Sequence, residues 1–438
     1  MQHVDAIGFG NSNPDIETLR THNIREGFHA LYALARYRQS EEARRLADAS
    51  IEAIMELWDP SDGWNVDRLE SEHGIAVSPD GTFISGLARA IGPLVKYYRT
   101  TGHGPALELA VLLKDKAVAE FFADDGRYDG ELFGHHTHST TCVMSSLAQL
   151  VDLTRDESLL RRVKAFYDNG LWEIRDGLGW VIESSRPDSD PDRGEVNNTG
   201  DIVETALILG RHGYPEYFED AERILRSHLL PSQLRDVSFI LDPPNPDDED
   251  GLREVADRHL GAFGFPAPYG HEPVGAPRVS FNMDIVGGAV ASLCEAYGNA
   301  AHHDTAGHWL DLHFDHKTDA VEMESPYTHP LMQVTPKRSG PLFVRLPSWM
   351  DPRDVRVDQR PPLVGVLNSE PGTPRISGGY VYVPRPQVGT PVSIGYPLPK
   401  REITLRHRTR GIQVRLRGDE VEAMDSFGAD LTYFDPID

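Results

Sequence analysis

Cysteine is almost absent from this chain, whose 438 residues include only Cys142 and Cys294. Because both lie inside apolar helical patterns, they supply neither a disulfide framework nor a thiolate zinc site. Basic residues are also scarce: 43 Lys and Arg face 68 Asp and Glu, which gives a net charge of −25. This excess of negative charge argues against nucleic acid and anionic membranes as partners, because binding phosphates requires clustered Lys and Arg.

Long apolar runs are missing as well. No stretch approaches the about 18–20 apolar residues that would cross a bilayer. The start, MQHVDAIGFGNSNPD, lacks the basic and apolar regions of a secretory signal. We therefore expect a cytoplasmic protein. The remaining composition, 39% apolar and 25% charged residues, is typical of a globular protein that is long enough for two cores.

Residues 13–298 repeat their apolar residues at spacings of three and four, which predicts helices. Apolar segments rich in small residues, such as MDIVGGAVASLCEAYGNA, alternate with amphipathic segments, such as EEARRLADASIEAIMELW. This alternation is typical of an α/α toroid, in which inner helices are buried all round and outer helices have one wet face. About nine helices are legible, fewer than a complete barrel needs, so we expect the N-terminal end of the barrel to be incomplete.

After Gly307 the apolar period changes to two. Segments such as PLFVRLPSW, GGYVYVPRP and IQVRLR predict strands that Pro and Gly turns separate. We therefore predict a mainly α protein: an (α/α) toroid barrel over residues 1–300, followed by an antiparallel β-sandwich over residues 301–438.

Three predicted helix entrances carry an unusual density of polar side chains. Inner helices of such a barrel point their N-termini toward one face, where unpaired N–H groups and positive dipole ends suit polar ligands. The entrances are GELFGHHTHSTT (130–141), the stretch from Trp180 to Gly210, and FPAPYGHEPVGAPRVSFNMDIVGG (265–288). The side chains that we assign to substrate binding are His136, His138, Asn198, Glu204, Trp64, Tyr269, His271 and Asn282.

The order of the segments HTHSTT, GWVIES, NNTGDIVETALILG, AERILRSHLLPSQ and GPLFVRLPSWM resembles that of the β-L-arabinofuranosidase glycoside hydrolases, family 127. The likeness covers most of the chain after residue 80, and the phrase VRLPSW is among its most specific parts. The resemblance implies an α/α barrel with a β-sandwich, and hydrolysis of furanosides with retention.

The resemblance also implies catalytic residues. The family's acid/base glutamate follows a strand, and Glu183 occupies that place. The family's nucleophile is a cysteine held on zinc by other cysteines and a glutamate, but here the corresponding segments read NTG (198–200) and FNMD (281–284). Since the thiolates are gone, we carry over no zinc chemistry and expect no metal and no cofactor. Asp284 is the favoured second carboxylate, and Asp201 is the reserve.

These carboxylates also admit structural interpretations. Acids in a first helical turn stabilise the helix dipole by roughly 0.3–1 kcal/mol each, which is sufficient to explain Asp201 and Glu204. Asp284 could cap its helix, although a carboxylate facing so apolar a helix is costly unless it is paired or used. Glu183 could be a solvated loop residue.

We predict a glycoside hydrolase acting on a small furanoside or uronide, with its carboxylate pair at the inner-helix mouth of the barrel. The separation of the two carboxyl groups distinguishes retention, at about 5–5.5 Å, from inversion, at about 6.5–9.5 Å. Two alternatives stay open. One is a sugar epimerase or polysaccharide lyase that abstracts a proton with His or Tyr; the other is a degenerate family member that binds glycan without turnover.

Overall fold

The structure is a computed structural model that describes residues 18–19, 21, 24–77, 82–241, 254–271, 283–325, 327, 329–359 and 375–437. For residues 18, 19, 77, 283 and 284 it describes the backbone only. The chain divides into two compact units. The first comprises Met1–Arg175 and Val181–Asp201, and the second comprises Asp176–Trp180 and Ile202–Asp438.

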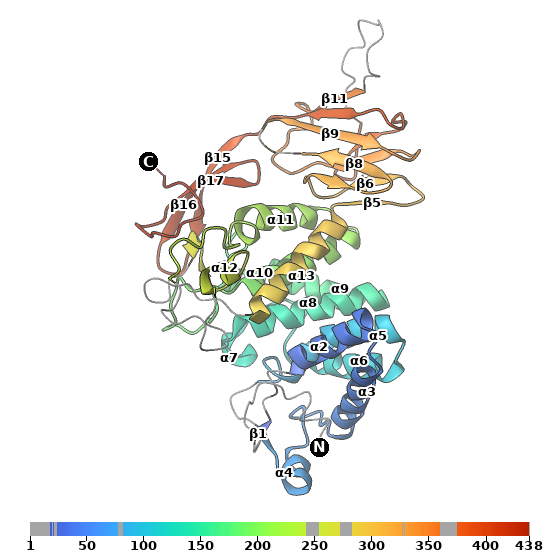
Figure 1. Ribbon diagram of the computed structural model, residues 1–438, viewed down its shortest axis with the longest axis vertical. Helices are drawn as coiled ribbons and strands as arrows, with labels where there is room; N and C mark the ends of the chain where they lie inside the picture. The colour runs from blue at the N-terminus through green and yellow to red at the C-terminus, as the bar shows by residue number, and fades with distance from the viewer. Residues whose placement is uncertain are drawn as a thin grey trace, which may run out of the picture. The chain divides into compact units, whose positions relative to one another are not determined.

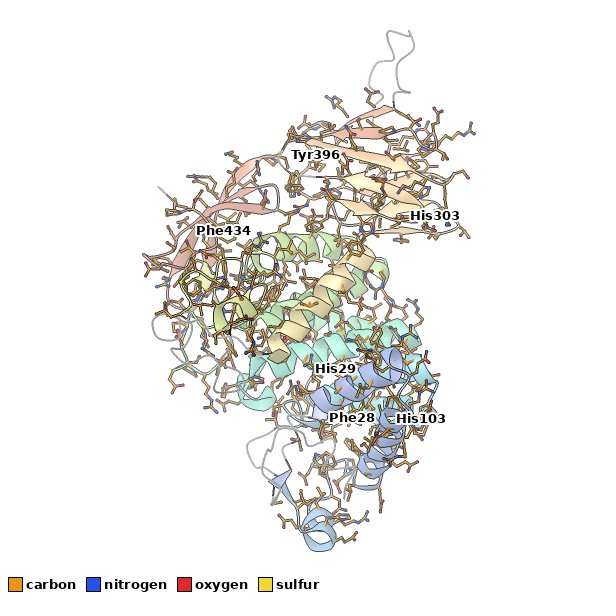
Figure 2. All side chains as sticks on the ribbon, viewed as in Figure 1. Phe28, His29, His103, His303, Tyr396 and Phe434 are labelled. Atoms are coloured by element: carbon orange, nitrogen blue, oxygen red, sulfur yellow. The ribbon has the colours of Figure 1, made fainter. Side chains whose placement is uncertain are left out.

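Helices build the first unit (Figure 1). They are α2 (Ile24–Tyr37), α3 (Glu41–Glu56), α4 (Val66–His73), η2 (Leu87–Ala90), α5 (Ile91–Thr101), α6 (Gly104–Glu120), α7 (Gly130–Phe133), α8 (Thr137–Thr154), α9 (Glu157–Asp168) and η3 (Gly170–Glu173). A short parallel pair, β1 (Thr18–Leu19) and β2 (Ala76–Val77), accompanies them. Side chains fill the space between these helices (Figure 2), and Phe28 on α2 is only 1% exposed.

The helices α8 and α9 show the predicted alternation of inner and outer helices. On α8, every residue from Thr137 to Val151 is buried. On α9, the buried residues Leu159, Leu160, Val163, Phe166 and Tyr167 follow helical spacing and form one face. The start of α9 is fixed by Asp156, whose carboxylate accepts hydrogen bonds from two backbone N–H groups of the first turn.

Helix α10 (Val196–Arg211) begins in the first unit and continues into the second. The second unit also contains α11 (Glu216–Ile224), the π-helical turn η4 (Leu225–Leu229), α12 (Val255–His259) and α13 (Met283–Asn299). On α11, the buried Glu222 forms ion pairs with Arg226 and Arg345 and accepts a hydrogen bond from the backbone N–H of His313. This buried charge network connects a helix to the strand region of the same unit.

Strands follow α13. One five-stranded sheet has the order β12-β13-β10-β6-β5, formed by Arg375–Ser377, Tyr380–Val383, Leu342–Arg345, His308–Leu310 and Ala301–His303. The other has the order β11-β14-β9-β8-β7, formed by Arg356–Gln359, Val392–Gly395, Leu331–Pro336, Val321–Glu324 and His316–Lys317. Both sheets contribute to one apolar core, which includes Leu310, Val344, Met323, Val334 and Ile394, so they form a sandwich. All strand pairs in them are antiparallel except β6 with β10.

The last strands form a separate antiparallel sheet, which the sequence pattern did not distinguish from the sandwich. It consists of β15 (Lys400–Arg406), β16 (Gly411–Arg417) and β17 (Glu420–Met424). Its apolar residues pack with Leu178, Ala267 and Tyr269, and the last two belong to the hairpin of β3 (Pro266–Ala267) and β4 (Gly270–His271). The predicted order, helices first and antiparallel sheets last, is confirmed.

The predicted domain limits, 1–300 and 301–438, remain a prediction. Helix α13 ends at Asn299 and β5 begins at Ala301, whereas the two compact units divide within α10. Among the helices in the described ranges, none combines the length and the low polarity that crossing a bilayer requires.

Candidate functional site

Two of the predicted helix entrances meet in the first unit. His136 is the N-cap residue of α8, and His138 lies in the first turn of that helix. Glu195 directly precedes α10, and Asn198 and Asp201 lie in the first two turns of α10. We call His136, His138, Glu195, Asn198 and Asp201 the helix-entrance site.

Short backbone pairings bring these segments together. Residues 181–185 run between residues 135–137 on one side and residues 193–195 on the other. The N–H of Thr137 donates to the carbonyl of Glu183 at 3.2 Å, and the N–H of Glu195 donates to the carbonyl of Val181 at 3.2 Å. Because paired extended segments lie about 4.8 Å apart, this arrangement fixes Glu183 between the two helix entrances.

Glycine permits the turn that leads into α8. Gly134 ends α7 with φ +82°, in a region that glycine adopts readily and other residues rarely do. After this turn, His135 accepts a backbone hydrogen bond from Ser185 at 2.9 Å, and His136 pairs with Ser184. The conformation of Gly134 therefore helps to place His136 at the start of the helix.

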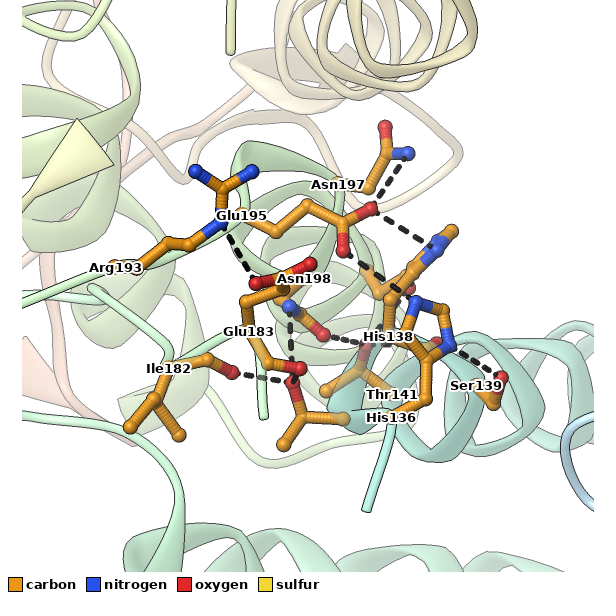
Figure 3. Close-up of polar contacts among 12 residues, drawn as sticks. His136, His138, Ser139, Thr141, Ile182, Glu183, Arg193, Glu195, Asn197 and Asn198 are labelled. Atoms are coloured by element: carbon orange, nitrogen blue, oxygen red, sulfur yellow. Dashed lines mark hydrogen bonds and ion pairs between the residues drawn. The ribbon is translucent and has the colours of Figure 1, made fainter. Parts of the chain in front are cut away.

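Glu195 lies at the centre of the site (Figure 3). Its Oε1 is 3.2 Å from Nδ1 of His138, and its Oε2 is 3.7 Å from Nε2 of His136. Asn197 donates a hydrogen bond to Oε1 at 3.3 Å. Glu195 is only 5% exposed. Burying a carboxylate costs free energy, so neighbouring charges or hydrogen bonds must compensate for the lost contact with water.

Asp201 faces the other ring nitrogen of His138. Its Oδ2 is 3.6 Å from Nε2 of His138 and 2.9 Å from the hydroxyl of Thr141. His138 is itself only 1% exposed, and its two ring nitrogens face two buried carboxylates, Glu195 and Asp201. This arrangement fixes the orientation of the ring and concentrates negative charge around it.

Arg25 on α2 supplies positive charge near Asp201. Burial opposes the charge of the guanidinium, but the negative charges of Glu26 and Asp201 outweigh this effect and leave the pKa of Arg25 raised above its usual range. Burial is also the main reason that the pKa of the Cys142 thiol is raised. Cys142 is therefore stabilised as a neutral thiol.

Glu183 lies at a more accessible edge of the site. Its side chain is 32% exposed, and its Oε2 accepts a hydrogen bond from Nε of Arg193 at 2.8 Å (Figure 3). Since Arg193 lies two residues before Glu195, one short segment contributes both the partner of Glu183 and the central carboxylate.

Two other predicted binding residues in the first unit are buried. The side-chain oxygen of Asn198 lies 2.7 Å from the Thr141 hydroxyl, and its amide nitrogen donates to the Thr137 hydroxyl at 3.3 Å. These contacts connect α10 to α8, and Asn198 is fully buried. Trp64 is only 4% exposed and does not offer a ring face to solvent on which a sugar could stack.

The remaining predicted residues belong to the second unit or lie outside the described residues. Glu204 is half-buried on α10. Tyr269 accepts a hydrogen bond from Arg410 at 3.1 Å and contacts the ring of Phe427. The ring of His271 lies 4.9 Å from that of Tyr433, and burial lowers the pKa of His271 to about 4. Asn282 lies outside the described residues, and for Asp284 only the backbone is described.

Sequence reasoning missed Glu195. Among the described residues, one group of His, Cys, Asp and Glu side chains could hold a metal ion. It consists of His136, His138 and Glu195, whose three ligand atoms lie within 4.8 Å of one another. The expectation of no metal did not anticipate this grouping. His-x-His was visible in the sequence, but it is a weak signal without knowledge of the third side chain, which lies 57 residues after His138.

No family model matches the sequence, and no curated protein sequence matches it. Solved structures do match. One is Ara127N-Se, a GH127 β-L-arabinofuranosidase from Geobacillus stearothermophilus T6, with 16% identity and a TM-score of 0.50 over 96% of this chain and 79% of that chain. Another is a GH127 β-arabinofuranosidase, with 13% identity and a TM-score of 0.54 over 96% of this chain and 78% of that chain. The likeness that the order of segments indicated is therefore confirmed at the level of the fold: the chain has the (α/α) toroid and C-terminal β-sheet architecture of the GH127 β-L-arabinofuranosidases.

Proposed function

We propose that this protein is a glycoside hydrolase acting on a small furanoside or uronide. The observation that carries the proposal is the pairing of residues 181–185 with both helix entrances, which brings Glu183 beside the partly buried group of His136, His138 and Glu195. The fold shared with β-L-arabinofuranosidases supports the same class of reaction.

In this proposal, Glu183 is the general acid. Hydrolysis of a glycosidic bond requires a proton donor for the leaving oxygen and a second group that acts on the other side of the sugar ring. The paired segments carry two carboxylates, Glu183 and Glu195. Glu183 is the more exposed of the two, so a substrate can reach it. We expect the contact with Arg193 to loosen when substrate binds, so that the Glu183 carboxyl can contact the leaving oxygen.

The second role, activation of water, belongs to the group centred on Glu195. His136 is the accessible member of this group, with a side chain that is 36% exposed. We assign Asp201 to positioning His138, because Asp201 is buried and faces the ring nitrogen that points away from Glu195. The role of Asp284, the second carboxylate favoured by the sequence, stays a prediction.

The experiment is a screen of purified protein against nitrophenyl and alkyl glycosides, as furanosides, pyranosides and uronides. Glu183→Gln should lower kcat on alkyl glycosides by about 10²–10⁴-fold, the usual contribution of a general acid. It should affect nitrophenyl glycosides much less, since a nitrophenolate leaves without protonation. Glu108→Gln, at an exposed position on α6, is the matched control. Equal loss on both substrate types would remove Glu183 from the acid role.

A second candidate is proton abstraction, as in an epimerase or a lyase. His136 with Glu195 behind its ring is an arrangement that also suits a general base. Deuterium incorporation from D₂O next to a substrate carbonyl, or an unsaturated uronide product, would select this candidate over hydrolysis.

A further inference from the structure

The group of His136, His138 and Glu195 offers one nitrogen from each ring and one carboxylate to a common point. Nδ1 of His138 is 3.2 Å from Oε1 of Glu195, and Nε2 of His136 is 3.7 Å from Oε2. We propose that this group binds a divalent transition-metal cation, with Zn²⁺ as the best match. The proposal concerns binding and goes beyond the hydrolysis proposed above.

The distances fit such a cation. Zinc bonds of about 2.0–2.2 Å to nitrogen and oxygen, in tetrahedral geometry, place neighbouring ligand atoms about 3.3–3.5 Å apart. The separations of 3.2 Å to Oε1 and 3.7 Å to Oε2 of Glu195 are close to this value, and one ligand atom from each of the three residues lies within 4.8 Å of the other two. The ring planes of His136 and His138 are 73° apart, with centroids 5.9 Å apart. The two imidazoles therefore approach from different directions, as tetrahedral ligands must.

Each ligand is oriented by a second contact. Nδ1 of His136 lies 2.8 Å from the Ser139 hydroxyl, and Nε2 of His138 faces Asp201 at 3.6 Å. Asn197 donates to Glu195. Metal-binding histidines almost always contact a carboxylate, a backbone carbonyl or water with the other ring nitrogen, because this contact sets the tautomer and raises the basicity of the ligand nitrogen.

Burial and charge support a cation at this place. Glu195 is 5% exposed and Asp201 is 9% exposed, so two carboxylates lie in a poorly solvated region around His138. Burying ionised carboxylates is costly unless positive charge lies close to them. A divalent cation between Glu195 and the two rings would add positive charge beside the Glu195 carboxylate, as Arg25 does near Asp201.

The ligand set also selects the class of metal. Two imidazoles and one carboxylate suit Zn²⁺ and its neighbours in the first transition row, whereas Ca²⁺ and Mg²⁺ prefer oxygen ligands alone. His138 and Glu195 are buried, but the side chain of His136 is 36% exposed. Three protein ligands with one accessible side leave a coordination position for water or substrate.

The test measures binding without substrate, so its result is independent of whether the protein hydrolyses glycosides. Untagged protein is stripped with EDTA, dialysed, and titrated with ZnCl₂ by calorimetry, and its metal content is measured by mass spectrometry after a second dialysis. We expect one equivalent of zinc per chain. His136→Ala and Glu195→Gln should each weaken binding by at least about 100-fold, since removing a ligand costs more than removing the groups behind it.

His135→Ala is the matched control, because His135 is the neighbouring histidine and contacts Glu131 and Ser185 instead of the group. It should bind zinc like the unaltered protein. Circular dichroism of each variant separates loss of a ligand from loss of the fold. Stripped protein that takes up no zinc overturns the proposal, and so does folded His136→Ala protein that binds zinc with unchanged affinity.

Discussion

Oε1 of Glu195 lies 3.2 Å from Nδ1 of His138, although 57 residues separate them in the sequence. The contact joins the start of α10 to the start of α8, and it depends on a backbone segment, residues 181–185, that pairs with both. Both helix N-termini therefore approach the same group of side chains, and the positive dipole end of α10 favours the carboxylate of Glu195, which directly precedes that helix.

Replacing Glu195 by Gln should slow hydrolysis irrespective of the leaving group. Activation of water does not involve the leaving oxygen, so kcat on nitrophenyl and alkyl glycosides should fall by a similar factor, about 10²-fold or more. The measurement is kcat of Glu195→Gln on both substrate types. It is compared with kcat of Glu183→Gln, for which we expect a loss that depends on the leaving group. Glu131→Gln, with a side chain that is 89% exposed, is the control. A loss confined to alkyl glycosides would contradict the assigned role.

The hydroxyl of Thr141 should stabilise the junction of α8 and α10. It lies 2.7 Å from Asn198 and 2.9 Å from Asp201, and all three residues are buried. Thr141→Val leaves those partners with one contact fewer and should lower the free energy of unfolding by about 1–3 kcal/mol. Urea denaturation measures the change.

The neighbouring residue gives a matched control for that substitution. The hydroxyl of Thr140 is buried and has no hydrogen-bond partner among the described residues. Thr140→Val should therefore be neutral or slightly stabilising, because it removes a buried polar group that makes no hydrogen bond. Equal destabilisation by the two substitutions would show that the altered packing of valine, and not the loss of the Thr141 hydrogen bonds, lowers the free energy of unfolding.

Glu222 should make stability depend on pH in the acid range. Burial opposes its ionisation, but His313, Arg226 and Arg345 outweigh this effect and lower its pKa from 4.5 to about 2. A carboxyl with a lowered folded-state pKa contributes stability above its unfolded pKa and loses it as the pH falls. The unaltered protein should thus lose stability between about pH 4.5 and pH 2.

Glu222→Gln tests this contribution. The substitution leaves Arg226 and Arg345 buried without their carboxylate, which should cost about 3–5 kcal/mol at pH 7. The deficit should shrink toward pH 2, near the folded-state pKa, where the native carboxyl itself becomes partly protonated. Urea titrations across this pH range measure both effects, and Glu216→Gln at an exposed position of α11 should change little. A deficit that stays constant down to pH 2 would argue against the ionic origin.

Asp419 should have the opposite pH dependence. Burial raises its pKa from 3.8 to about 6, although Arg223 and the hydrogen bond from Trp349 at 2.7 Å partly counteract the shift. Since the folded state holds this proton more tightly than the unfolded state, the contribution of Asp419 to stability falls as the pH rises from about 4 to about 6. Asp419→Asn should therefore gain stability relative to the unaltered protein over this interval. Unfolding midpoints at pH 4, 5, 6 and 7 check the trend, and parallel curves would refute it.

The sequence was informative where apolar periodicity extends over whole helices or strands. The uninterrupted burial of α8 and the one-sided burial of α9 follow from their composition, and strands such as β13 (Tyr380–Val383) follow from alternation. The third sheet, β15 to β17, has the same period as the sandwich strands. Periodicity predicts strands but not which strands pair, so the pattern could not separate the third sheet from the sandwich.

The site was less predictable for a related reason. His136 was identified from its position at a helix entrance and Glu183 from the family resemblance, but Glu195 is placed by single backbone pairings too short to leave a periodic signal. Trp64, which we assigned to substrate binding, is buried, and burial of a loop residue depends on distant segments that local composition does not specify.

The continuity of α10 limits how this protein can be dissected. A fragment that stops at Asp201, where the first compact unit ends, would retain only residues 196–201 of the helix. Isolated helices shorter than about 12–15 residues are marginal in water, so this remnant would fray. Asn198 and Asp201 would then lose their fixed positions. Binding and catalytic assays therefore require a chain in which α10 reaches its natural end at Arg211.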